Sequence, residues 1–173
     1  MVIGTNLLIV CLYVDDLLVT ESNEREIEEF KKKMMKEFEM SDIGLLFLFF
    51  GIEFKTLEIC TVMHQTKYAT DLLKKFNMFK CNSTITPTET RLVLEKERTK
   101  ELINPTYFKQ IVGSLKYLCN TRLDLGFSVG LKSRFMEIPK RPYLLAIKRI
   151  MWHVKWTLYY RILFPKGSHN SEV

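Results

Sequence analysis

The sequence predicts an α+β fold in which β-hairpins with a helix between them are followed by an all-α helical bundle. Residues 7–20, LLIVCLYVDDLLVT, form a β-prone apolar run that only two aspartates interrupt. A second apolar run with imperfect alternation covers residues 45–65. From Thr66 onward apolar residues recur at spacings of three and four, which is the period of a helix. We therefore expect one region at residues 1–65 and a helical region at residues 66–173.

Asp15 and Asp16 mark the tip of the first predicted hairpin, because aspartate is depleted in strands and favoured in turns. Two adjacent ionised carboxylates repel each other, and a nearby cation would compensate that repulsion. Mg²⁺ takes one or two carboxylates from a protein and completes its octahedron with water and phosphate oxygens. From the residues alone, the pair is either a solvated turn or a magnesium site.

The remaining elements follow from local signals. Asn23 is a helix N-cap, and an amphipathic helix is predicted after it. Two strands with a turn near residues 56–58 come next, and then a helix from Thr66 that fades by Asn77. Residues 80–104, rich in Thr, Ser, Pro and charge, are predicted to be a linker or long loop.

Three further helices complete the predicted bundle. Asn104 and Pro105 are a favourable N-cap and first helical residue. A second helix is predicted from about Asp124 through Phe135, and a third follows Pro142.

The charge is distributed unevenly along the chain. Residues 1–65 hold 6 Lys and Arg against 12 Asp and Glu, whereas residues 66–173 hold 20 against 8. An acidic part that could bind metal, joined to a basic part that could bind phosphate, suits an enzyme that acts on nucleic acid. A basic surface that only maintains solubility explains the same balance, and both readings stay open.

A row of basic residues is predicted on the last helix. Arg141, Lys148 and Lys155 are spaced by seven residues, and Lys132 and Arg134 lie just upstream. Such a row can follow the phosphates of a duplex at successive turns, although a solvated helix face has the same pattern.

Cysteine and hydropathy patterns exclude several classes of protein. Cys11, Cys60, Cys81 and Cys119 are scattered and form no Cys-x-x-Cys pair, so neither a disulfide framework nor a zinc site is indicated. The first apolar run is interrupted too early to span a bilayer. We therefore expect an intracellular protein, cytoplasmic or nuclear, with no membrane partner.

The residues Tyr13-Val14-Asp15-Asp16 match the Tyr-x-Asp-Asp signature of reverse transcriptases, and the chain resembles copia-type LTR retrotransposon polymerases. The resemblance covers about residues 7–160. It continues through FKKKMMKEFEMSDIGLLFLFFGIEF, HQTKYATDLLKKFNM, ITPTE, YFKQIVGSLKYLCNTRLDLGFSVGLKSRFM and AIKRI.

The resemblance implies roles for the acidic hairpin, which would lie in the polymerase palm. Asp15 would coordinate both catalytic Mg²⁺ or Mn²⁺ ions, and Asp16 would coordinate metal or shape the field around it. Tyr13 and Val14 would line the primer terminus and the incoming deoxynucleoside triphosphate. The reaction would be two-metal phosphoryl transfer to a DNA primer on an RNA template.

The resemblance also implies nucleic-acid contacts outside the hairpin. Residues 47–54, with Phe50 and Gly51, resemble the primer-grip hairpin that holds the growing primer end. The helices from Tyr68 onward resemble the thumb, whose basic face grips template and primer. On this basis residues 1–65 are palm-like and residues 66–173 are thumb-like.

The chain departs from the family pattern in several places. From the resemblance we expect this chain to lack the further catalytic aspartate that the family carries upstream, the fingers, most of the palm and the RNase H domain. Leu123 stands where Pro is usual, Tyr143 where His is frequent, and MWHVKWT where a segment ending in Lys-Gly-Thr is expected. We therefore expect a truncated polymerase that is inactive alone, with weak or no metal binding.

Two alternatives to the polymerase fragment stay open. The first is a binding module that retains affinity for RNA or an RNA–DNA hybrid without catalysis. The second is a plain globular protein in which the carboxylates form a solvated turn and the helices only pack.

Overall fold

The structure, a computed structural model, describes residues 8–20, 23–89 and 101–166. The chain divides into two compact units, residues 1–45 and residues 46–173. Parts of the predictions for the chain ends and for the 80–104 loop lie outside the described residues.

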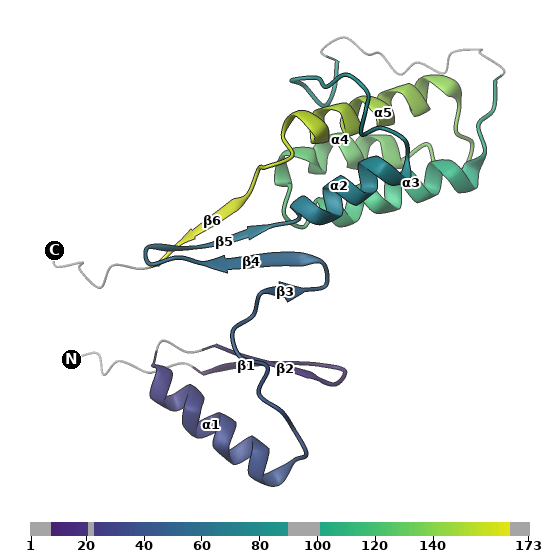
Figure 1. Ribbon diagram of the computed structural model, residues 1–173. Coiled ribbons are helices and arrows are strands. Elements are labelled where there is room, and N and C mark those ends of the chain that lie inside the picture. The colour runs from purple at the N-terminus through teal and green to yellow at the C-terminus, as the bar shows by residue number, and fades with distance from the viewer. Residues whose placement is uncertain (1–7, 21–22, 90–100, 167–173) are drawn as a thin grey trace, which may run out of the picture. The chain divides into compact units, whose positions relative to one another are not determined.

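The first unit contains the acidic hairpin and one helix (Figure 1). Strands β1 (Ile9–Tyr13) and β2 (Asp16–Thr20) pair antiparallel, with Tyr13 opposite Asp16. Helix α1 (Glu24–Glu37) follows, and the Asn23 side chain caps it by accepting a hydrogen bond from the Arg25 N–H at 3.1 Å. The predicted hairpin and the predicted helix are both confirmed.

The apolar side chains of this unit are not packed into a core of their own. None of its described residues is buried, and helix α1 has no buried residue. An isolated two-stranded hairpin is marginally stable in water. The described part of the first unit therefore lacks the buried apolar surface that stabilises an independent domain.

The second unit opens with an antiparallel sheet in the strand order β3-β4-β5-β6. Its strands are β3 (Leu48–Phe49), β4 (Ile52–Thr56), β5 (Cys60–His64) and β6 (Ile162–Pro165). The turn predicted near residues 56–58 joins β4 to β5, where the Leu57 N–H donates to the Cys60 carbonyl at 2.8 Å. Strand β6 pairs with β5, with Thr61 opposite Phe164.

Strand β6 is an element that the sequence analysis did not predict within the helical region of residues 66–173. The run Ile162-Leu163-Phe164 is apolar but too short to reveal its period, and it becomes a strand because β5 offers an edge. Pro165 is tolerated because β6 is itself an edge strand. The palm-like and thumb-like division at residue 65 stays a prediction, while β5 and α2 belong to one compact unit.

Four helices form the rest of the second unit. They are α2 (Thr66–Lys75), α3 (Pro105–Leu118), α4 (Leu123–Ser133) and α5 (Arg141–Trp156). The predicted cap at α3 is present, because the Asn104 side chain accepts from the Thr106 and Tyr107 N–H groups at 2.9 and 3.3 Å. Helix α4 ends before Phe135, which the sequence had placed inside it.

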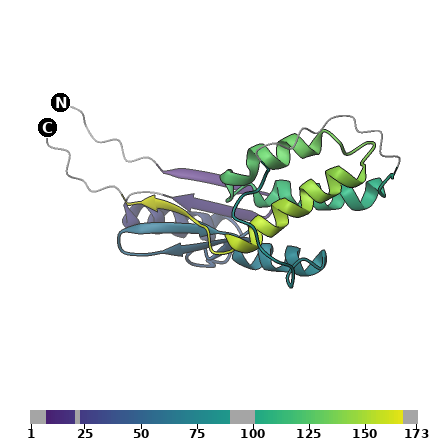
Figure 2. The same cartoon turned by 90° about the horizontal axis from the view of Figure 1, so that it is seen from above.

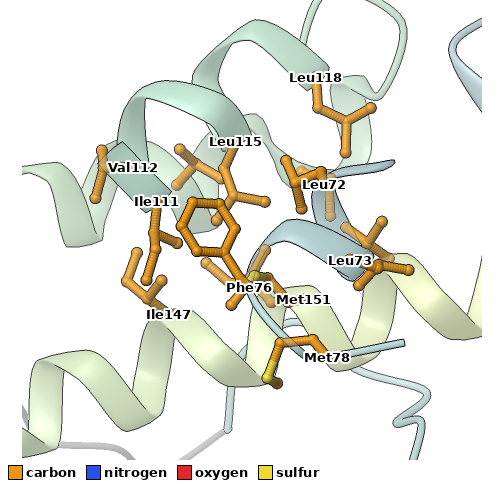
Figure 3. Close-up of a cluster of buried hydrophobic side chains, with 14 of the residues drawn as sticks. Leu72, Leu73, Phe76, Met78, Ile111, Val112, Leu115, Leu118, Ile147 and Met151 are labelled. Carbon is orange, nitrogen blue, oxygen red and sulfur yellow. The ribbon is translucent and has the colours of Figure 1, made fainter. Parts of the chain in front are cut away.

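The apolar core of the second unit lies among these helices (Figure 3). Its centre is formed by side chains that are almost fully inaccessible, including Leu73, Phe108, Ile111, Leu115, Leu118, Leu125, Ile147 and Met151. They recur at helical spacing, so each helix places one face in the core. Burial of this surface is the main stabilising term of the unit.

A buried guanidinium connects the turn between α3 and α4 to the end of α5. Arg122 donates to both carboxylate oxygens of Asp124, at 2.9 and 2.7 Å, and to the Thr157 carbonyl at 3.0 Å. His153 Nε2 lies 3.4 Å from the same carboxylate. The Arg122 side chain is only 4% exposed, and burying its charge is tolerated because these partners pair with it.

The carboxyl of Asp124 titrates below its ordinary pKa of 3.8. Burial opposes ionisation, but the hydrogen bond and charge of Arg122, with a contribution from His153, outweigh it. Because the pKa of Asp124 is lower in the folded than in the unfolded protein, its ionised carboxylate stabilises the fold fully at pH values above the unfolded pKa. This stabilisation is lost as the pH falls below about 3.8 through the folded value.

We expect Asp124→Asn to lower the free energy of unfolding by about 2 kcal/mol at pH 7, since it leaves Arg122 buried with a neutral partner. The difference from the wild type should shrink in acid below the ordinary aspartate pKa. Urea unfolding at a series of pH values measures both effects. Asp71→Asn, at an exposed position, is the matched control, and a pH-independent difference for Asp124→Asn would contradict the assignment.

Candidate functional site

The acidic hairpin closes with a two-residue loop. Tyr13 and Asp16 are the last paired residues, and Val14 and Asp15 form the loop. Val14 has a φ of +50°, in the left-handed region, whereas Asp15 does not have a positive φ. The predicted site residues Tyr13, Val14, Asp15 and Asp16 are therefore adjacent at one hairpin tip.

Val14 is an unusual residue for its backbone conformation. A loop position with positive φ in a two-residue hairpin favours glycine, asparagine or aspartate, and a β-branched residue there is a genuine outlier. Its side chain is 78% exposed, so no burial in the described structure compensates the strain. Strained residues of this kind cluster at active sites and ligand clamps, which makes the hairpin tip a candidate functional site.

The oxygen donors of the tip suit one hydrated Mg²⁺ or Mn²⁺ ion. Asp15 and Asp16 are both exposed, and carboxylates are hard ligands that these ions accept together with water. Within the described residues no group of three or more His, Cys, Asp or Glu side chains could hold a metal. A pair of bridged ions needs more ligands than these two carboxylates supply.

A second tight turn presents Phe50 in the other unit. Phe49 pairs with Ile52, and the loop residues Phe50 and Gly51 have φ values of +49° and +70°, the pattern of a type I′ turn. Phe50 remains 49% exposed. The hairpin that the family resemblance implied around Gly51 is therefore present, with a bulky aromatic residue at its tip.

Gly51 lies against an aromatic pair on the helices. A Cβ at Gly51 would approach the Tyr117 hydroxyl to 3.2 Å. The Tyr117 ring meets Tyr68 edge to face at 4.7 Å, and the Tyr68 hydroxyl donates to the Ser114 carbonyl at 3.1 Å. Burial raises the pKa of Tyr68, so its hydroxyl stays protonated as a donor. No sequence pattern indicates the role of Tyr117, because this contact is purely tertiary.

The predicted basic residues are not all exposed. Lys132 is buried, with 1% of the residue exposed, and burial lowers the pKa of its ammonium group. It therefore does not join an exposed row of cations. Arg134 is exposed and is the C-cap residue of α4, upstream of α5 as expected.

The three predicted residues of α5 differ in their surroundings. Arg141 is exposed and donates to Glu101 at 2.9 Å, which raises the pKa of Arg141. Lys148 is half-buried, and the Lys155 ammonium donates to the Cys81 carbonyl. Arg149, which the sequence analysis missed, donates to Glu89 at 2.8 Å and to Thr86 at 3.0 Å. No local sequence pattern indicates this pairing, because the partners lie about sixty residues earlier in the chain.

Comparisons with known proteins agree with this arrangement of motifs. Residues 1–90 match the sequence profile of the reverse transcriptase (RNA-dependent DNA polymerase) family. Relatives include the retrovirus-related Pol polyprotein from transposon RE1 of Arabidopsis thaliana, which is 32% identical over 97% of this chain. The corresponding polyprotein from transposon TNT 1-94 of Nicotiana tabacum is 29% identical over 88% of the chain. An uncharacterized mitochondrial protein of Arabidopsis thaliana is 32% identical over 91%.

The chain belongs to the reverse transcriptase family, and its polyprotein relatives are those of copia-type retrotransposons. It spans 12% of the length of the RE1 polyprotein and 65% of the mitochondrial protein. No solved structure matches it significantly. In the part of the chain that the structure describes, no helix is long and apolar enough to cross a membrane.

We expect Gly51→Ala to lower the free energy of unfolding of the second unit by about 1 to 2 kcal/mol, because alanine is strained at positive φ and its methyl group would meet Tyr117. Urea unfolding measures the change. In a Tyr117→Phe background the cost should fall, since the hydroxyl is gone.

Gly126→Ala is the control for this substitution. A Cβ at Gly126 meets no atom within 4 Å, and alanine favours a helix, so this variant should be neutral or slightly stabilised. Equal effects at the two glycines would mean that Tyr117 does not constrain the turn.

Proposed function

We propose that this chain is a polymerase part of a copia-type retrotransposon Pol polyprotein, and that its ancestral reaction extends a DNA primer on an RNA template. The observation that carries the proposal is the strained Tyr13–Asp16 turn with two exposed carboxylates, in a chain of the reverse transcriptase family. A divalent ion bound there would activate the primer hydroxyl and steady the triphosphate of the incoming nucleotide.

The residues of the tip have distinct roles in this proposal. Asp15, in the loop, supplies the carboxylate that holds metal against the triphosphate. Asp16, the first residue of β2, supplies a second oxygen donor or lowers the local potential. Tyr13 and Val14 contact the primer terminus and the nucleotide, which the exposed position of both side chains permits.

We further propose that the 173-residue chain, assayed alone, does not polymerise DNA. Phosphoryl transfer depends on positioning the attacking hydroxyl and on neutralising the charge of the leaving pyrophosphate. Two neighbouring carboxylates hold one hydrated ion weakly, with an affinity on the order of millimolar. The described residues offer no third acidic ligand beside them.

The expected result of a primer-extension assay on an RNA template, with Mg²⁺ or Mn²⁺, is no incorporation above background. The Asp15→Asn variant is the matched control, because it removes one ligand and keeps the size of the side chain. Incorporation by the wild-type chain that disappears in Asp15→Asn would show that two carboxylates suffice. That outcome would overturn the proposed inactivity while supporting the proposed metal role of Asp15.

A second candidate function is binding of RNA or an RNA–DNA hybrid without catalysis. It is favoured by the cations of α5, where Arg141, Lys148 and Lys155 recur every two turns. Phosphate backbones bind such rows through release of counterions, so the affinity falls steeply with salt. Phe50, exposed beside Gly51, offers an aromatic face for a base or sugar.

We expect the chain to bind an RNA–DNA primer–template in the absence of Mg²⁺, with an affinity that falls as salt rises. When Arg141, Lys148 and Lys155 are all replaced by alanine, the slope of log affinity against log salt concentration should decrease in magnitude by about 2 to 3. Fluorescence anisotropy across a salt series measures the slope. Lys55, Lys74 and Lys109, exposed on other elements, give a charge-matched triple control.

An unchanged slope in the α5 triple variant would mean that this face is only solvated. Absence of both metal binding and nucleic-acid binding would favour the third reading, a globular protein with a solvated acidic turn.

A further inference from the structure

Two described stretches of the chain lie along α5. Residues 81–89 follow α2, and there the Thr84 N–H donates to the Trp152 carbonyl at 3.3 Å. Residues 101–103 precede α3, and there the Ile103 N–H donates to the Pro139 carbonyl at 3.0 Å, just before α5 begins. Figures 1 and 2 show the loop after α2 beside α5 from two directions.

These stretches place acceptor oxygens on the cations of α5. Glu89 and Thr86 bind Arg149 at 2.8 and 3.0 Å. At the first residue of α5, Glu101 binds Arg141 at 2.9 Å, and the Glu101 carbonyl also accepts from the Arg141 N–H at 3.3 Å. The Cys81 carbonyl accepts from the Lys155 ammonium.

The acceptors are chemically similar to the groups that nucleic acid would offer. A guanidinium binds carboxylate and phosphate oxygens with the same fork of donors. Both carboxylates are exposed, the Arg141 side chain is exposed as well and that of Arg149 is 25% exposed, so solvent and salt weaken the pair at Arg141 most. A phosphate can therefore replace either carboxylate while the guanidinium stays paired.

We propose that residues 81–89 and 101–103 form a strap that occupies the basic face of α5, and that nucleic acid binds this face by displacing the strap carboxylates of Glu89 and Glu101. The proposal rests on the proposed nucleic-acid binding and adds an autoinhibitory contact to it. It also adds Arg149 to the cations that contact phosphate. Because the strap is part of the same chain, it competes at a high effective concentration.

The test measures how tightly a short RNA–DNA duplex binds to the wild type and to a double variant that carries both Glu89→Gln and Glu101→Gln. We expect affinity to rise roughly three- to tenfold at low salt, because two ion pairs with exposed carboxylates no longer have to be broken. The slope of log affinity against log salt concentration should become steeper by about 1 to 2. In the wild type the displaced carboxylates take up cations, which offsets part of the counterion release, whereas Gln side chains take up none. The combined variant Glu58→Gln with Asp71→Asn changes the net charge equally at exposed positions off the strap.

Hydrogen exchange gives a readout that does not depend on net charge. The Thr84 and Ile103 amides, which bond to Trp152 and Pro139, should exchange faster in the wild type when saturating duplex is added. Unchanged or slower exchange, or equal affinity and slope in the strap and control variants, would overturn the strap. If neither the wild type nor the strap variant binds duplex at all, nucleic-acid binding itself is wrong, and the strap with it.

Discussion

The buried interaction of Arg122 with Asp124 and Thr157 is the constraint on which the second unit depends. It fixes the turn between α3 and α4 to the end of α5, and the chain continues from there into β6. Strand β6 pairs with β5, and β5 leads directly into α2. One charged side chain thus connects the helical core to the sheet that carries the Phe50–Gly51 turn. The guanidinium is tolerated inside because hydrogen bonds satisfy its donors.

Both candidate sites are built from the same local device. Each is a two-residue hairpin turn in which a bulky apolar residue, Val14 or Phe50, takes a backbone conformation that glycine or asparagine normally adopts. The turn geometry holds each side chain out from its hairpin, and both are substantially exposed. Strain that is kept at an exposed tip is consistent with contact to a ligand rather than with packing.

Local signals predicted most of the elements, and tertiary contacts explain what was missed. The caps at Asn23 and Asn104 act within three residues, so the sequence was sufficient to place α1 and α3. Strand β6 pairs with residues about a hundred positions earlier, and no local pattern records such a partner. The burial of Lys132 and the pairing of Arg149 with Glu89 likewise depend on how the helices and the following loop pack. The acidic turn was predicted because its chemistry is contiguous in the sequence.

The central claim is that the turn of Asp15 and Asp16 is a divalent-metal site, and titration with Mn²⁺ tests it most directly. Paramagnetic broadening of backbone amide signals reports which residues lie near the bound ion. We predict that the amide signals of residues 13–17 broaden first. Glu28 and Glu29 of α1 are also two neighbouring carboxylates, and their signals should not broaden at the same Mn²⁺ concentration. The double substitution Asp15→Asn with Asp16→Asn should abolish the broadening. Broadening that is equal at the two acidic pairs, or that survives the double substitution, would contradict the claim.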